Sequence, residues 1–354
     1  MSEQNETGAA MQEDGVEVAD ATDAAEVMDV VEESPARLDD WPAFLESLHG
    51  GFAERSAQGL PLQLYAFVDS RGYPGLDARL AAAHGVRHAS LWRETNLDAY
   101  PDIAPHLIAF DRQALATGSE QHRLLHELWT RLVDLHAVTW AWSPLPFDRL
   151  DAHCRQYVVY TLPGGRRFFL FFFDNHVLAR LRLVWSDAQA QRFLAPFVAL
   201  RYRDRWRKEV VWRNEAAVGA DGGVIGSDSL VDLDDTQHAR LIALGYPDKL
   251  ALQFRETMAM SVDHLSDVEL YEAIVLLLER AAGYGIEDAA QVLSYVTIGV
   301  HVSPRFDEHP DVQACLAAVK RGEMDVDAAL AGIGDAQWDA IRDAMELTRL
   351  GGAG

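Results

Sequence analysis

Two histidines and two aspartates are the residues whose types and spacing could support chemistry in this chain. His122 and His126 lie four residues apart, one helical turn, so they could bind a metal ion together. A zinc hydrolase has a glutamate directly after the first histidine, and Arg123 occupies that position here. Asp69 and Asp174 each follow a run of strand-forming residues, and as a pair they could act as general acid and general base.

Each of these residues also has an ordinary structural explanation. The histidines suit the polar side of an amphipathic helix, and an aspartate after a strand suits the cap of the next turn or helix. The sequence contains no nucleophile elbow, phosphate-binding loop or dinucleotide glycine fingerprint. We therefore expect no catalytic residue, no metal and no cofactor. The alternative is an uncharacterised metal-dependent hydrolase or nuclease.

Basic and aromatic residues gather in one segment of this acidic chain. Strand-like alternation predicts that Arg201, Arg203, Arg205 and Arg207 share one face, with Tyr202 and Trp206 on the other. The segment could be a strand whose arginines pair with nearby acids, an interface with another protein, or a nucleic-acid surface. The residues that we take forward as candidate protein-binding residues are Arg201, Arg203, Arg205, Trp206, Arg207 and Trp212.

Length, composition and charge narrow the possible classes of protein. The chain has 354 residues, 49% of them hydrophobic, which is enough for a sizeable core. Its formal net charge of −24 at pH 7 opposes binding to nucleic acid or to an anionic membrane. No apolar run approaches the roughly 20 residues of a membrane helix, and the N-terminus lacks the features of a signal peptide. We expect a cytoplasmic protein.

Changes in composition along the chain predict its domains. Residues 1–35 are acidic and contain no lysine or arginine, so we expect a disordered tail. Strand and helix patterns alternate over residues 36–215, which predicts an α/β domain. Residues 216–231 are rich in Gly, Asp and Ser and are predicted to be a linker. Residues 232–354 show only helical periodicity. The predicted fold class is α+β, with an N-terminal mixed α/β lobe around a central sheet and an all-helical C-terminal lobe.

The centre of the first lobe is predicted from residues 157–181. Two strand-like runs flank Pro163-Gly164-Gly165, and the second run, residues 168–173, is apolar at every position. Such a run is typical of a strand that is covered on both faces. Asp174 then begins a helical pattern and is predicted to be its N-cap. In the second lobe the predicted helices include Asp234–Tyr246 and Asp248–Ser261, which meet at a proline.

Three segments, in this order and spacing, resemble the adaptor and chaperone family of type VI secretion effectors. The first contains Tyr65 and Asp69 followed by Tyr73-Pro74, and is similar to the family's LYALVD and YP. The second is residues 102–108, which contains Pro105 and is similar to AGPWLVPL. The resemblance extends over about residues 62–213, and its third segment also shows where this chain departs from the family pattern.

The third segment, residues 162–178, is similar to PDGRRVLLRFYDPRVL and contains Phe173 and Asp174. Three positions depart from that pattern. Phe171 replaces an arginine, Asn175 replaces the proline after the aspartate, and His176 replaces a second arginine. The departures remove two cations from the surroundings of Asp174, but Asn and His are both compatible with the start of a helix.

The resemblance implies a function that the residue patterns alone do not. It implies a non-enzymatic protein of the cytoplasm of a Gram-negative bacterium, which takes part in toxin delivery. Such a protein binds a cognate effector toxin and hands it to the valine-glycine-repeat spike protein. The structural motif residues that the resemblance implies are Tyr65, Asp69, Pro105, Phe173 and Asp174.

Overall fold

The computed structural model describes residues 40–56, 62–112, 116, 118–214 and 231–351. These residues divide into two compact units, one ending at Gly245 and the other beginning at Tyr246. The predicted tail, residues 1–35, lies outside the described residues, as does the predicted linker except for Val231. The predicted domain boundaries stay a prediction. The division between the compact units falls inside a helix.

The first unit contains two sheets. Its strands are β1 (Gln63–Val68), β2 (Arg87–Ser90), β3 (His106–Phe110), β4 (Val138–Ser143), β5 (Val159–Thr161), β6 (Arg167–Phe169), β7 (Ala199–Arg203), β8 (Glu209–Arg213) and β9 (Val231–Asp232). Within the described residues, the large sheet has six strands in the order β2-β3-β1-β4-β7-β8, and all neighbours are antiparallel. The small sheet has the order β6-β5-β9.

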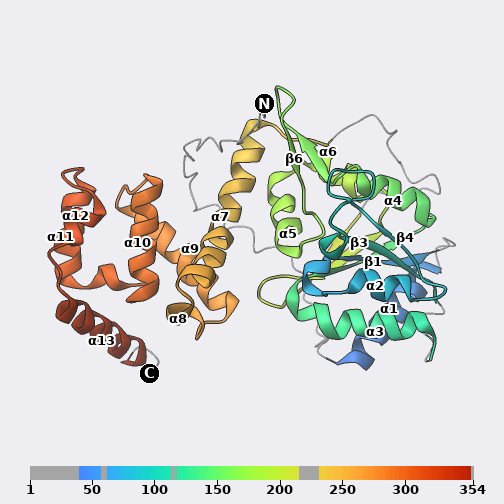
Figure 1. Ribbon diagram of the computed structural model, residues 1–354, viewed down its shortest axis with the longest axis horizontal. Helices are drawn as coiled ribbons and strands as arrows, with labels where there is room; N and C mark the ends of the chain where they lie inside the picture. Colours follow the sequence, from blue (N-terminus) through green and yellow to red (C-terminus); the bar gives the residue numbers. More distant parts are fainter. Residues whose placement is uncertain (1–39, 57–61, 113–115, 117, 215–230, 352–354) are drawn as a thin grey trace, which may run out of the picture. The chain divides into compact units, whose positions relative to one another are not determined.

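Helices cover both faces of the large sheet (Figure 1). One face packs against α1 (Trp41–Ser56), α2 (Leu76–Ala81) and α3 (Glu120–Leu132), and the other against α4 (Phe147–Arg155), α5 (Asn175–Val184) and α6 (Asp187–Leu194). Strand β1 alternates accordingly, with Leu64, Ala66 and Val68 in one core cluster and Tyr65 and Phe67 in the other. Burial on both faces explains why β1 is apolar at nearly every position.

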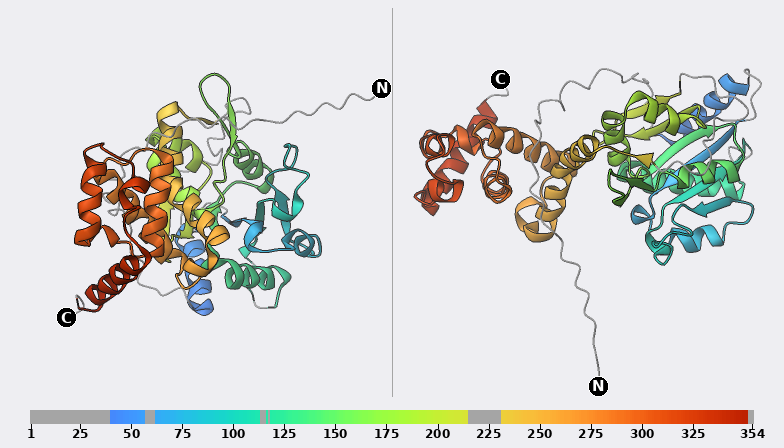
Figure 2. Two further views of the ribbon diagram at one scale, coloured as in Figure 1. Left: turned by 60° about the vertical axis from the view of Figure 1, so that its left-hand side comes forward. Right: turned by 90° about the horizontal axis from the view of Figure 1, so that it is seen from above.

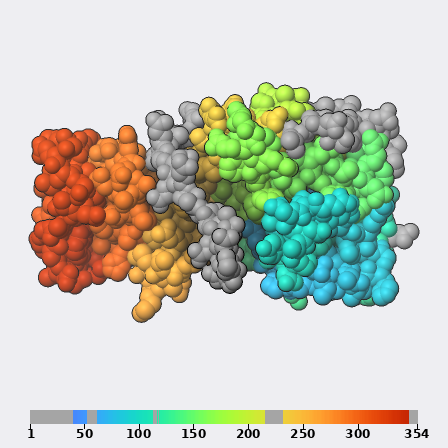
Figure 3. Space-filling view, turned by 45° about the horizontal axis from the view of Figure 1, so that its top comes forward, coloured from blue at the N-terminus to red at the C-terminus, as the bar shows by residue number. Residues whose placement is uncertain are grey.

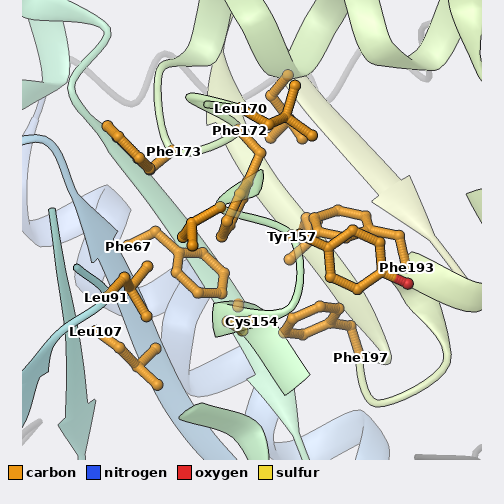
Figure 4. Close-up of a cluster of buried hydrophobic side chains, with 14 of the residues drawn as sticks. Phe67, Leu91, Leu107, Cys154, Tyr157, Leu170, Phe172, Phe173, Phe193 and Phe197 are labelled. Atoms are coloured by element: carbon orange, nitrogen blue, oxygen red, sulfur yellow. The ribbon is translucent and has the colours of Figure 1, made fainter. Parts of the chain in front are cut away.

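Residues distant in sequence meet in these cores. Figure 4 shows Phe67 of β1 close to Phe172, with Tyr157, Phe193 and Phe197 beside them. The ring centroids of Phe67 and Phe172 are 5.7 Å apart. The two halves of this unit also adjoin at the surface. In Figure 3 the cyan atoms of the first half of this unit lie directly beside the green atoms of its second half.

The run of residues 168–173 does not form the buried central strand that its composition predicts. β5 and β6 do form a hairpin, and its turn extends beyond the neighbouring elements (Figure 1; Figure 2, left). Pro163 and Gly164 occupy the centre of the turn, where Gly164 has φ 86°. However, β6 ends at Phe169 and is an edge strand of the small sheet. Phe172 and Phe173 are buried from a non-strand segment that leads into α5, so the prediction of a strand covered on both faces is wrong.

The second unit is helical in its described residues. Helix α7 (Asp235–Thr257) crosses the division between the units, followed by α8 (Ala259–Val262), α9 (Asp267–Gly283), α10 (Ala289–His301), α11 (Pro310–Lys320), α12 (Val326–Leu330) and α13 (Asp335–Gly351). The prediction of two helices meeting at Pro247 is wrong, since α7 continues through this buried proline. Burial of Pro247, Leu250 and Phe254 helps to offset the roughly 3 kcal/mol cost of proline in a helix interior. The predicted α+β fold class is confirmed.

The helices in the described part of the chain differ in length and hydropathy. None of these helices is both long and apolar enough to cross a membrane.

Candidate protein-binding surface

The strand register brings four connections to one end of the large sheet. Val68 lies opposite both His106 and Val138, and Trp140 lies opposite Arg201. The end of β1, the starts of β3 and β4 and the end of β7 therefore face the same way. We call this region the sheet end. It consists of residues 69–72 with the 3₁₀ turn η2 (Ser70–Gly72), residues 100–105 with η3 (Pro101–Ile103), residues 133–136 with η5 (Val133–Leu135), and the β7–β8 turn (residues 204–208).

Both motif aspartates bind the same arginine at the sheet end. The Arg71 guanidinium donates through Nε to both Asp69 oxygens at 2.9 Å, and its Nη2 also contacts Asp69. The same Nη2 donates to Asp174 Oδ2 at 3.1 Å. The Asp69 side chain is buried, whereas that of Asp174 is partly exposed. Arg71 therefore supplies a cation beside Asp174 that comes from a distant segment.

Both aspartates also cap the elements that follow them. Asp69 accepts a hydrogen bond from the backbone N–H of Arg71 at 3.0 Å, and Asp174 accepts one from His176 at 2.9 Å. The prediction that Asp174 is the N-cap of a helix is confirmed. The carboxylates hold the start of α5 beside the end of β1, and an arginine lies between them. This arrangement accounts for both residues without acid–base chemistry.

Asn175, which departs from the family pattern, forms a buried polar contact between α5 and two strands. Its Oδ1 accepts from Thr139 Oγ1 at 2.8 Å, and its Nδ2 donates to the carbonyls of Val138 and Arg203 at 3.2 and 3.3 Å. Its backbone N–H donates to the carbonyl of His136 at 3.3 Å. A proline could make none of these donations. Asparagine at this position therefore ties α5 to the sheet end.

The remaining motif residues are structural. The Tyr65 hydroxyl donates to the carbonyl of Leu145 at 2.6 Å, and burial raises the pKa of Tyr65 above its usual value. Pro105 is buried where β3 begins, and its carbonyl accepts from Leu91 N–H at 2.9 Å. Phe173 lies in the core, with its ring centroid 6.3 Å from that of Trp92. These three residues fix the framework that supports the sheet end.

Two of the candidate arginines are buried. Arg201 forms an ion pair with Glu209 at 2.5 Å, donates to Ser47 Oγ at 2.8 Å and lies over the Phe44 ring. Burial lowers the pKa of Arg201, and the charge of Glu209 opposes this effect. Arg203 pairs with Asp134 at 3.0 Å. These two residues therefore pair with nearby acids and do not form an exposed basic face.

The predicted alternation beyond Arg203 is wrong, because β7 ends there and the chain turns. Lys208 N–H donates to Asp204 Oδ1 at 2.8 Å, and Asp204 N–H donates to the Lys208 carbonyl at 2.9 Å. Trp206 is 52% exposed at the tip of this turn, and Arg207 and Lys208 are also exposed. Trp212 lies in β8, beyond the turn, and packs against the core beside Trp185. The structure thus separates Trp206 and Arg207 from Trp212.

His122 and His126 pack against an aromatic side chain. Their rings lie 5.5 and 4.6 Å from that of Trp41, measured between centroids. In the described residues, no group of three or more His, Cys, Asp or Glu side chains is arranged to hold a metal ion. The pair therefore helps to attach α1 to α3.

Further exposed residues of the sheet end were not identified from the sequence. Tyr100, Ile103 and Leu135 are 56%, 43% and 57% exposed. Isolated apolar residues in connections follow no periodic pattern, so nothing in the sequence groups them. Only the strand order and register bring them together at the sheet end.

The chain was compared with known proteins. No curated protein and no solved structure matches it. Over residues 64–192, which run from β1 into α6 and contain all five motif residues but not the β7–β8 turn, the chain matches the family described as Domain of unknown function (DUF4123).

Proposed function

We propose that this protein is an adaptor that binds a cognate type VI secretion effector and loads it onto the valine-glycine-repeat spike protein. The family match over residues 64–192 carries this proposal, because it covers the three segments that resemble the effector adaptor family. The mechanism is binding without turnover. The protein acts in the cytoplasm, before the toxin leaves the cell.

The geometry of the motif residues supports a binding role. Asp69 and Asp174 come from segments more than a hundred residues apart, yet both bind Arg71. Their oxygens are used to cap η2 and α5 and to hold these elements together. A surface that is formed by connections held together at one end of a sheet is suited to recognition of another protein.

Co-expression tests the proposal directly. The full chain is produced with the toxin encoded by the neighbouring gene, and the tagged chain is purified and analysed by light scattering. We expect a stable complex of defined stoichiometry, with the toxin at its full mass. A toxin that elutes entirely apart from the chain, or is cleaved by it, would contradict the proposed function.

A further inference from the structure

The exposed apolar side chains of the first unit are concentrated at the sheet end. Among its described residues, the large hydrophobic side chains that are clearly exposed are Tyr100, Ile103, Leu135, Trp206 and Ile242. All but Ile242 belong to the connections at the sheet end. Single exposed apolar residues are normal on a soluble protein, but their concentration at the sheet end marks a site of interaction.

These side chains follow the order of the strands. Ile103 precedes β3, Leu135 precedes β4 and Trp206 follows β7. Since β3 and β7 are three strand positions apart, and neighbouring strands are about 4.8 Å apart, the strand ends behind this row span roughly 15 Å. The connections between them are packed together, because η3 contacts η2 and a Cβ on Gly72 would lie 3.7 Å from Leu135 Cδ1. A row of this length accommodates about five residues of an extended peptide.

Charge at the sheet end differs from that of the whole chain. The β7–β8 turn carries Arg205, Arg207 and Lys208, and its one acid, Asp204, has a pKa raised by burial. Asp134, the acid beside Leu135, is paired with Arg203. The opposite end of the row is acidic, since residues 100–105 contain the exposed Asp102 and no lysine or arginine. In a chain of net charge −24, the exposed Arg207 and Lys208 of this turn are the cations suited to a partner's carboxylates.

Arg207 occupies a position of the turn that glycine would fit better. Arg207 has φ 61°, a left-handed conformation that is uncommon for residues other than glycine, asparagine and aspartate. Glycine would adopt this conformation without strain. The Arg207 N–H donates to the carbonyl of Asp204 at 3.0 Å, so residues 204–207 form a hairpin turn that closes with a left-handed residue. An arginine at this position adds an exposed cation to the turn where glycine would add none.

We infer that the sheet end is the docking site for an acidic segment of the effector, in which a large apolar side chain is flanked by carboxylates. The apolar side chain packs against the row of Ile103, Leu135 and Trp206, and the carboxylates lie over Arg207 and Lys208. This inference rests on the proposed function, since it names the surface by which the adaptor holds its toxin.

Affinity measurements on the full chain test the inference. Purified toxin is titrated against the wild type, the charge-reversed variant Trp206→Ala/Arg207→Glu/Lys208→Glu and a neutral variant, Arg207→Gln/Lys208→Gln. We expect the charge-reversed variant to bind at least tenfold more weakly and the neutral variant to be intermediate. Wild-type affinity should also fall when salt is raised from 50 to 300 mM. The matched control is Arg166→Glu/Arg167→Glu/Ile242→Ala, which also reverses two exposed cations and removes one exposed apolar side chain, and it should bind as the wild type does.

Several results would overturn the inference. Binding that is unchanged by charge reversal, or that is insensitive to salt, would show that another surface holds the toxin, while the proposed function would stand. Displacement of the toxin by duplex DNA, or by a synthetic peptide of residues 1–39, would assign the sheet end to a different occupant. If the wild type itself does not bind the toxin, the proposed function fails. Unchanged circular dichroism and thermal midpoints confirm that each variant is folded.

Discussion

Asp174 combines two roles that substitution can separate. It caps α5 and it binds Arg71. Asp174→Ala removes both interactions, and we expect it to lower the free energy of unfolding of the first unit by about 1–2 kcal/mol. Asp174→Asn keeps a capping oxygen and loses only the charge, so its loss should be well below 1 kcal/mol. Urea denaturation measures both values. Equal losses in the two variants would mean that the cap contributes little.

Two buried histidines make the stability of the first unit depend on pH. Burial lowers the pKa values of His106 and His153 to about 4, from an ordinary value near 6.5. The unfolded chain therefore takes up protons at a higher pH than the folded chain does. Stability is complete above about pH 7 and falls as the pH drops from about 6.5 to about 4, by roughly 2 kcal/mol for each histidine at pH 5.

This dependence can be measured by urea denaturation at pH 7 and pH 5. His106→Gln and His153→Gln should each reduce the difference in stability between the two pH values, whatever their effect at pH 7. His84→Gln is the control, because His84 is exposed. A pH dependence that is the same in all three variants and the wild type would show that other groups cause it.

Arg207 should trade stability for binding. Arg207→Gly relieves the left-handed strain, and we expect the free energy of unfolding to rise by up to about 1 kcal/mol. The same change removes a cation from the sheet end, so toxin affinity should fall. Thermal unfolding and titration on the same preparation compare the two effects. A variant that is both less stable and equally tight in binding would contradict this account of the turn.

At the scale of elements, the packing of α9 against α10 depends on a glycine. A Cβ at position 299 would lie 2.1 Å from Leu277 Cδ2, and Leu277 is fully buried. Alanine normally stabilises a helix relative to glycine by about 1 kcal/mol, but overpacking a core costs about 1–3 kcal/mol. We therefore expect Gly299→Ala to destabilise the second unit.

Gly283→Ala is the matched comparison, since position 283 ends α9 and a Cβ there would meet no atom within 4 Å. It should be neutral or slightly stabilising. Denaturation of both variants decides between helix propensity and packing as the dominant effect. If Gly299→Ala were as stable as Gly283→Ala, the Leu277 side chain would have to move, or α9 and α10 to separate, without cost.

Local signals in the sequence predicted individual elements well, but they predicted tertiary positions poorly. The cap at Asp174 depends on residues within one turn, and the structure confirms it. The composition of residues 168–173 predicts a central strand because an apolar run indicates burial, but a segment outside the sheet can be buried too. α7 continues through Pro247 because packing overrides the local preference of proline.

The candidate site was predicted only in part, for the same reason. The basic and aromatic segment was recognised, but the turn after Arg203 divides it into buried and exposed residues. That Arg71 joins Asp69 to Asp174 could not be predicted, since it depends on α5 starting beside the end of β1. Residues that belong to the sheet end are brought there by a strand order that no local pattern specifies.

At the scale of the whole molecule, the two units have separate cores. Two core clusters belong to the first unit and a third, which shares no residue with them, belongs to the second. We therefore expect two calorimetric transitions. Asp174→Ala should shift only one of them and Gly299→Ala only the other. A single transition that both substitutions lower equally would show that the units unfold together.

The central claim is that this chain connects a toxin to the secretion spike. The most direct measurement is a reconstitution in which immobilised valine-glycine-repeat spike protein is offered the purified toxin with and without the full chain. The account predicts that the toxin is retained only when the chain is present, and that the Trp206→Ala/Arg207→Glu/Lys208→Glu variant retains much less. Equal retention of the toxin without the chain would contradict the account.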